Sequence, residues 1–284
     1  MVRRSKGYLC WAIVKESGRK FFADNGLFLA SGLSFDLLLY CMPLSLLLVS
    51  GLGYTLVESD QALPWVQESL QNFLPGSQKA FFDALDKIIN NRGPLGLVGF
   101  LAFFLISSSL FGSIRTILNT IFRITTPGSF LKGKCKDFLV MMAVSVLLLV
   151  TISVELLDTI ITALSKQLPS AQWLLHTGLR LATNLIGFLF TAALFFLLYR
   201  FSPTRSLPVP GLLVGSFTGA GLFALSKIAF SVYVSVAQSI TVLYGALGGL
   251  IFFFLWLFYS STVFVVGAEV SWAYYHVCRS LREG

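Results

Sequence analysis

The sequence has little charge, few histidines and few cysteines, and each shortage argues against a class of function. Charged residues make up 12% of the 284 residues, against about a quarter in soluble globular proteins, so this is not the composition of a soluble domain. The two histidines, His176 and His276, fall on opposite sides of the predicted membrane, so we expect no metal site and no cofactor. No glycine loop leads into GK[ST], and GxSxG and CxxC are absent, so we expect no enzymatic activity.

Apolar residues, by contrast, make up 56% of the chain and gather in long runs. About 20 mostly apolar residues suffice for a helix to cross a bilayer. Six such runs occur, at about 27 to 54, 94 to 114, 137 to 163, 178 to 201, 208 to 236 and 243 to 275. The predicted fold class is therefore all-α, an integral membrane bundle of six transmembrane helices. Residues 27–276 form this single domain, between an N-terminal arm, 1–26, and a tail, 277–284.

Two segments outside the spans are predicted to be helical. Between about residues 60 and 92, apolar residues recur at helical spacing on both sides of Pro75 and Gly76, which predicts a short external helical hairpin. The arm combines Tyr8, Trp11, Phe21 and Phe22 with basic residues, the pattern of an interfacial helix held by anionic lipid headgroups. A basic segment that only sets the topology is an equal alternative.

The lysines and arginines predict the orientation of the spans. Most of them lie in the arm, in the connections after the second and fourth spans, and in the tail, which all fall on one side of the membrane. The positive-inside rule assigns this side to the cytoplasm, so we expect both termini to be cytoplasmic. This distribution explains the net charge of +8, and no nucleic-acid partner is expected. No cysteine falls on the outer side, so no disulfide framework is implied.

Three ionisable residues, Asp36, Lys227 and Glu269, fall inside predicted spans. A charge in hydrocarbon is costly, so such residues face a polar path or pair with other helices. Asp36 lies near the midplane, where a place on a polar path and a purely structural hydrogen bond are both open. Lys227 either reaches toward Asp36 or snorkels outward, and snorkelling is favoured.

Glu269 lies near the cytoplasmic end of the last span. Arg200, Arg19 and Lys20 are candidate partners on that side of the membrane. An ion pair at the interface is therefore favoured over a transport site at this position.

Glycines recur at four-residue intervals in the last two spans, which indicates close helix packing. They are Gly211, Gly215 and Gly219 in the fifth span and Gly245 and Gly249 in the sixth. The pattern does not distinguish contacts within one chain from contacts between two copies in a homo-oligomer.

Five stretches stand out together: ASGLSFDLLLYCMPLSLLL, SSSLFGSIRTILNTIF, LLYRFSP, PGLLVGSFTGAGLFALSKIAFSVYVS and YGALGGLIFFFLWLFYSSTVFVVGAEV. In this order and spacing, over nearly the whole chain, they resemble the YihY/BrkB family. Asp36 departs from the family pattern. The positions that match it most clearly are Pro43, Arg115, Asn119, Tyr199, Arg200, Pro203, Pro210, Gly211, Lys227, Tyr244, Gly245, Gly248, Gly267 and Glu269.

The resemblance implies a six-helix bundle of the bacterial inner membrane without an established biochemical activity. Some members have carried a ribonuclease label, which requires metal ligands that this sequence lacks. The predicted function is transport of lipid or other envelope-related substrates, with Asp36, Lys227 and Glu269 lining a polar path. The alternative is a non-transporting scaffold or assembly factor, whose glycines and basic segments bind partners.

Overall fold

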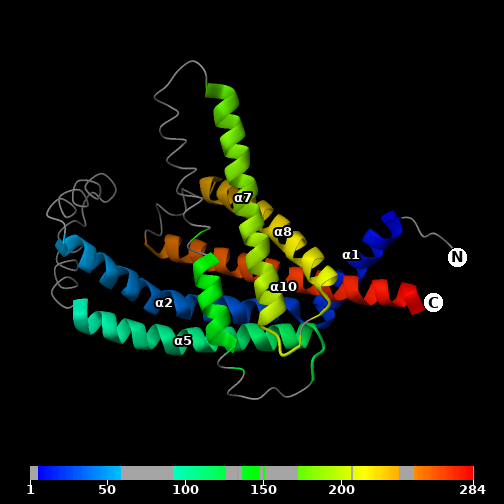
Figure 1. Ribbon diagram of the computed structural model, residues 1–284, viewed down its shortest axis with the longest axis horizontal. Coiled ribbons are helices and arrows are strands. Elements are labelled where there is room, and N and C mark those ends of the chain that lie inside the picture. The colour runs from blue at the N-terminus through cyan, green and yellow to red at the C-terminus, as the bar shows by residue number, and fades with distance from the viewer. Residues whose placement is uncertain are drawn as a thin grey trace. The chain divides into compact units, whose positions relative to one another are not determined.

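The computed structural model describes residues 6–58, 92–125, 133, 136–147, 150, 172–205, 207–236 and 246–283. Within these ranges every regular element is a helix (Figure 1). The long helices are α1 (Lys6–Ala23), α2 (Gly26–Glu58), α5 (Arg92–Ile121), α7 (Gln172–Phe201), α8 (Val209–Val236) and α10 (Ala246–Glu283). Residues 136–147 form a further helical segment. The all-helical class predicted from the apolar runs is confirmed over these residues.

Four helices in the described part of the chain are long and apolar enough to cross a bilayer. Their spans are Phe100–Ile121, Ala182–Phe201, Val209–Tyr233 and Leu250–Ser280. A fifth span is counted if Trp11–Ala23 and Gly26–Cys41, which are bent by 69°, cross together. A count of six stays a prediction, because most of the run at 137–163 lies outside the described residues. The predicted external hairpin, at about 60–92, lies almost wholly outside them as well.

The chain divides into two compact units, and the residues discussed below as a site belong to the first. This unit comprises Met1–Phe35 and Phe111–Gly284, and the second comprises Asp36–Leu110. In the second unit the rings of Tyr40 on α2 and Phe103 on α5 pack with their centroids 5.2 Å apart.

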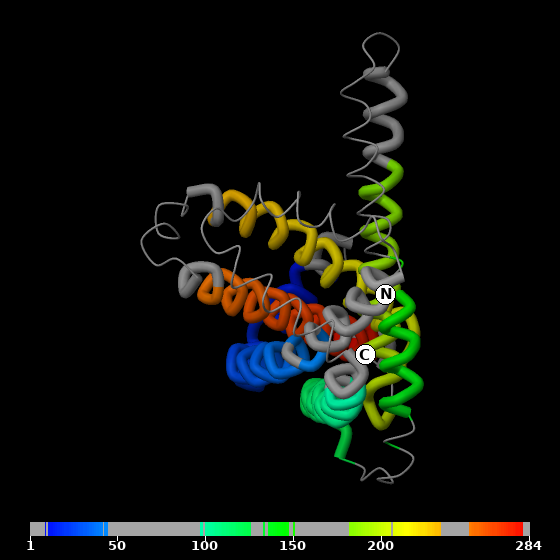
Figure 2. Tube along the Cα trace, turned by 90° about the vertical axis from the view of Figure 1, so that its left-hand side faces the viewer, coloured from blue at the N-terminus to red at the C-terminus, as the bar shows by residue number. Residues whose placement is uncertain are grey.

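In the first unit, α8 packs along α10 and also against α7 (Figure 1). The tube view from the side shows α8 and α10 as neighbours again (Figure 2). Glycine makes this approach possible, because a side-chain carbon at Gly215 would collide with the hydroxyl of Ser271 and the carbonyl of Gly267. Small residues of this kind let helix backbones come close within a membrane.

Helix α1 packs on α10 through one apolar face. Ile13 is buried there with Val270 and Ala273. On other faces of α1, Trp11 and Phe22 are exposed. Phe21, which the sequence suggested as one of the interfacial aromatic residues, is instead buried against Gly26 at the start of the next helix.

Candidate functional site

A network of buried charges lies where α1, the end of α5 and α10 meet. The Lys20 ammonium donates hydrogen bonds to Glu269 Oε2 at 2.8 Å, to Asp24 Oδ2 at 2.5 Å and to the Ile121 carbonyl at 2.8 Å. These three bonds use all three donors of the ammonium group. The side chain of Lys20 is 4% exposed and that of Glu269 is 0% exposed. Lys20 therefore joins three helices at a point sealed from solvent.

Two helix ends shape this network. Each of α1 and α5 is followed, two residues after its last residue, by a turn residue with positive φ: Asn25 at 54° after α1 and Arg123 at 56° after α5. After α5, the amide of Ile124 donates to the Asn119 carbonyl at 2.9 Å, and that of Arg123 donates to the Thr120 carbonyl at 3.2 Å. This is a Schellman ending, which satisfies carbonyls of the last helical turn. The Ile121 carbonyl, which has no partner within its own helix, receives the Lys20 ammonium.

The network is balanced in charge. Arg123 Nη2 lies 2.7 Å from Asp24 Oδ1, so Lys20 and Arg123 face Asp24 and Glu269. The Lys20 ammonium also lies 4.5 Å from the centroid of the Trp272 ring. Breaking a buried ion pair by removing one partner is strongly destabilising. The geometry is therefore that of a structural joint, and Lys20 is the partner of Glu269 among the three candidates.

A second group of charges gathers at the ends of α5 and α7 and the start of the helical segment 136–147. Arg115 forms an ion pair with Asp137 and donates to the Gly133 carbonyl at 2.7 Å. Lys136 donates to the Pro203 carbonyl at 2.7 Å. Burial, and after it the charge of Arg115, lowers the pKa of Lys136 below the usual lysine value; Arg200 acts in the same direction and Asp137 opposes them.

One further polar contact fixes the connection after α7. Asn119 Nδ2 donates to Thr204 Oγ1 at 3.0 Å, and the Thr204 amide donates to Asn119 Oδ1 at 2.9 Å. The side chain of a residue in α5 thus holds the chain that leaves α7.

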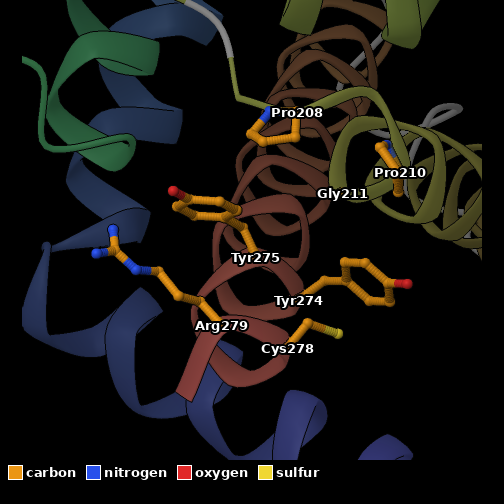
Figure 3. A pocket seen from close by; sticks show the side chains of 7 residues that line it. All are labelled: Pro208, Pro210, Gly211, Tyr274, Tyr275, Cys278 and Arg279. Carbon is orange, nitrogen blue, oxygen red and sulfur yellow. The ribbon is translucent and has the colours of Figure 1, made fainter. Parts of the chain in front are cut away.

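The interface between α8 and α10, called here the α8–α10 seam, has a cavity near each of its ends. One cavity measures about 290 Å³. Around it, Tyr274 and Cys278 extend to the side of α10 on which Pro210 lies, and Arg279 extends to the opposite side (Figure 3). The residues that line it are Pro208, Pro210, Gly211, Tyr274, Tyr275, Cys278 and Arg279. The other cavity measures about 300 Å³ and is lined by Ser226, Ala229, Phe230, Tyr233, Leu255 and Tyr259.

Between the two cavities the seam is closed. Gly215 and Gly219 of α8 face Gly267 of α10, and a side-chain carbon at Gly267 would lie 3.1 Å from the Gly215 carbonyl oxygen. Tyr199 of α7 is fully buried at the same level and donates to the Phe264 carbonyl at 2.7 Å.

The two cavities lie about a bilayer apart. From Gly211 in the first to Phe230 in the second, α8 rises about 29 Å at 1.5 Å per residue. The hydrocarbon core of a bilayer measures about 30 Å.

The ionisable residues singled out in the sequence do not line either of these cavities. Asp36 is half-buried on α2 and belongs to the second unit. Lys227 is exposed on α8, with its ammonium 5.9 Å from the centroid of the Phe223 ring. Gly249 lies near the start of α10, and Gly245 lies outside the described residues. Within the described ranges, no group of three or more His, Cys, Asp or Glu could hold a metal ion.

The sequence did not single out the aromatic residues of the second cavity or the part that Asp24 and Arg123 play beside Glu269. Tyr233 and Tyr259 lie in runs rich in aromatic residues, where spacing alone does not separate cavity walls from lipid-facing side chains. For the charge network a signal was present, since Asp24, Asn25 and Gly26 form a helix-breaking group between two apolar segments.

Comparison with known proteins places the chain among membrane proteins. The family described as virulence factor BrkB matches residues 18–283. A UPF0761 membrane protein of Halorhodospira halophila is 28% identical over 247 residues, covering 84% of this chain and 53% of the relative. One of Vibrio atlanticus is 28% identical over 242 residues, 85% of this chain and 75% of the relative.

A third relative, a UPF0761 membrane protein of Chlorobium phaeobacteroides, is 30% identical over 260 residues, which cover 88% of this chain and 54% of the relative. The chain thus spans about half the length of two of these three relatives. No solved structure matches the chain.

Proposed function

The chain belongs to the virulence factor BrkB family of membrane proteins, and we propose that it transports lipid or another envelope-related amphiphile along the α8–α10 seam. The names of the relatives state no activity, so the proposal rests on the chain's own geometry. The observation that carries it is the pair of cavities, which lie about a bilayer apart on one helix pair with a closed contact between them. We place the protein in the bacterial inner membrane with six spans and both termini cytoplasmic.

The chemistry of the two cavities suits a molecule with an apolar and a polar part. Aromatic and aliphatic side chains line the cavity at Phe230 and Tyr259 together with three hydroxyl-bearing residues, Ser226, Tyr233 and Tyr259, so this cavity offers both apolar and polar surface. The cavity at Pro208 likewise combines apolar walls with two tyrosines, and Tyr274 extends to the side of α10 on which Pro210 lies (Figure 3).

The closed middle of the seam suits a moving contact. Glycines offer no side chains that interlock, so the two helix backbones can part or slide at Gly215 without unpacking a large side chain. In this proposal an opening at one end of the seam alternates with an opening at the other, as in transporters with alternating access.

A scaffold without transport activity is the second candidate. The observation that favours it is the tight packing around Tyr199, whose hydroxyl is bonded to the Phe264 carbonyl and lies against Gly267. In a scaffold this contact is permanent, and the cavities are surface hollows filled by membrane lipid.

Reconstitution of the purified full chain into liposomes distinguishes the two. We expect faster exchange of a fluorescent phospholipid between leaflets, or faster flux of an amphiphilic solute, than in liposomes without protein. Ala229→Trp, which fills the cavity at Phe230, is expected to reduce this rate. Ile228→Trp is the matched control, because Ile228 is the neighbouring residue on α8, is 64% exposed and does not line that cavity.

The outcomes separate the candidates. Folded protein that moves none of the tested lipids and solutes would favour the scaffold. Equal rates for Ala229→Trp and Ile228→Trp, both faster than protein-free liposomes, would support transport but place it away from this cavity.

A further inference from the structure

One exposed surface, on α1, takes no part in the transport proposal or in the buried charge network. We call it the outward face of α1, and it comprises Trp11, Val14, Lys15, Gly18, Arg19 and Phe22. We propose that this face lies in the headgroup region of a bilayer leaflet that contains anionic lipid. The sequence alone left two alternatives for the arm, an interfacial helix and a basic segment that only sets the topology, and the structure of α1 favours the first.

The side chains of α1 are sorted by type around the helix. One side is buried against α10. At about 100° per residue, Val14, Trp11 and Phe22 fall together within an arc of about 80°. Their side chains are 70%, 58% and 73% exposed. Lys15 and Arg19 fall directly beside this arc, and an apolar arc next to cations is the pattern of a helix that lies in a membrane interface.

The two cations are accessible to lipid headgroups. The Lys15 ammonium lies 4.8 Å from the centroid of the Trp11 ring, so this cation stays close to the apolar arc. Arg19, which is 75% exposed, donates from Nη2 to Glu16 Oε1 at 2.8 Å. Surface ion pairs of this kind contribute little to stability, so a lipid phosphate can replace the carboxylate.

The geometry of α1 also fits a membrane surface. Trp11–Ala23 is bent by 69° from Gly26–Cys41, so α1 lies about 21° from the membrane plane where Gly26–Cys41 stands along the bilayer normal. Its contact with α10, at Val270 and Ala273, falls near the C-terminal end of the span Leu250–Ser280. A segment that only set the topology would require neither a fixed angle nor an exposed apolar arc.

The charge of the outward face favours lipid over a second copy of the chain. In a dimer with two-fold symmetry, the same patch of each subunit meets its counterpart. Lys15 and Arg19 of one copy would then meet the same cations of the other, and such like-charge contacts are unfavourable. An anionic leaflet instead attracts each basic residue near its surface.

The first test measures the depth of Gly18, where an added side-chain carbon has no neighbour within 4 Å. The full chain, with its four native cysteines replaced by serine, carries Gly18→Cys with a nitroxide label in liposomes of phosphatidylcholine and phosphatidylglycerol. Collisions with oxygen and with a water-soluble nickel chelate report depth. Arg19→Cys marks the predicted aqueous side, and Gly221→Cys, which is equally open and lies within the span Val209–Tyr233, marks the hydrocarbon. We expect the Gly18 label between the two, about 5 to 10 Å into the headgroup and acyl boundary.

The second test measures the lipid preference of the same position. A fluorophore at Gly18 is quenched by nitroxide-labelled phosphatidylglycerol or phosphatidylcholine at equal mole fraction, and we expect phosphatidylglycerol to quench it more. Lys15→Gln is expected to lower this preference about fivefold, the contribution of one basic residue near an anionic surface. Arg205→Gln removes one positive charge from an exposed position outside α1 and is expected to leave the preference unchanged.

Four results would overturn the proposal. A Gly18 label as accessible to the nickel chelate as the Arg19 label would place the outward face in water. A Gly18 label shielded from both oxygen and the chelate would show that protein covers this face. Equal quenching by the two lipids, or equal effects of Lys15→Gln and Arg205→Gln, would remove the role of its cations. Circular dichroism and size-exclusion chromatography establish that each variant is folded before it is reconstituted.

Discussion

At the scale of single residues, Lys20 connects three helices, a role that its place in a basic arm does not suggest. Its ammonium is bonded to two carboxylates and to the last turn of α5, and all of these groups are buried. We expect Lys20→Met to lower the free energy of unfolding by about 3 to 5 kcal/mol, because it leaves Asp24 and Glu269 buried with too little positive charge. Unfolding in mixed micelles, followed by circular dichroism, measures this loss.

Two further variants control that prediction. Arg19→Met removes an exposed cation one position away, whose pair with Glu16 is at the surface, and should change stability little. In Lys20→Met with Glu269→Gln, one charge of each sign is removed and Asp24 keeps Arg123, so much of the lost stability should return. Equal losses for Lys20→Met and Arg19→Met would show that the network is not the joint described here.

Residue-scale prediction from sequence succeeded in part. The position of Glu269 beside basic segments limited its partner to three candidates, and one of them is the partner found. The choice among them depended on how α1 packs on α10 and on the end of α5, whose Ile121 carbonyl accepts a hydrogen bond from Lys20. Such contacts depend on tertiary packing, which the sequence pattern alone does not contain.

At the scale of the elements, the α8–α10 contact depends on glycine at particular positions. We expect Gly215→Ala to destabilise the protein by about 1 to 3 kcal/mol, because the added methyl group meets the Ser271 hydroxyl and the Gly267 carbonyl. Gly221→Ala is the matched control on the same helix, where an added carbon has no neighbour within 4 Å, and should be neutral or slightly stabilising. A thermal unfolding midpoint for Gly215→Ala equal to that of Gly221→Ala would contradict the close contact.

Helix ends were the weakest part of the sequence-based account. The second span was predicted to end at about 114, but α5 continues to Ile121 through Thr116 and Thr120, whose hydroxyls donate to the carbonyls four residues earlier. Likewise, α10 runs to Glu283, so the predicted tail at 277–284 is mostly a continuation of the last helix. Hydropathy shows how long the apolar part of a helix is. Where polar residues continue the helix beyond that part, hydropathy does not show where the helix ends.

At the scale of the whole molecule, membrane residence and the helical class followed from the sequence, because charged residues are scarce and the apolar runs are long enough to cross a bilayer as helices. The position of the proposed transport path was harder to predict from the sequence. Ionisable residues within the spans predicted a route through Asp36, Lys227 and Glu269, whereas the cavities described here are lined mainly by aromatic, aliphatic and small residues of α8 and α10. The register between two helices decides where such hollows fall, and that register is a property of the packed pair.

The most direct test of transport along the α8–α10 seam is a reversible crosslink across it. A side-chain carbon at Gly211 would lie 3.7 Å from Cβ of Tyr275, within the range of about 3.5 to 4.5 Å found in disulfides. Gly211→Cys with Tyr275→Cys, in a chain whose four native cysteines are replaced by serine, can therefore be joined by oxidation.

The measurement is the rate of lipid exchange or solute flux in liposomes containing this variant, before oxidation, after oxidation and after reduction. Transport along the seam predicts that oxidation lowers the rate to that of protein-free liposomes and that reduction restores it. An unchanged rate in fully crosslinked protein would contradict it.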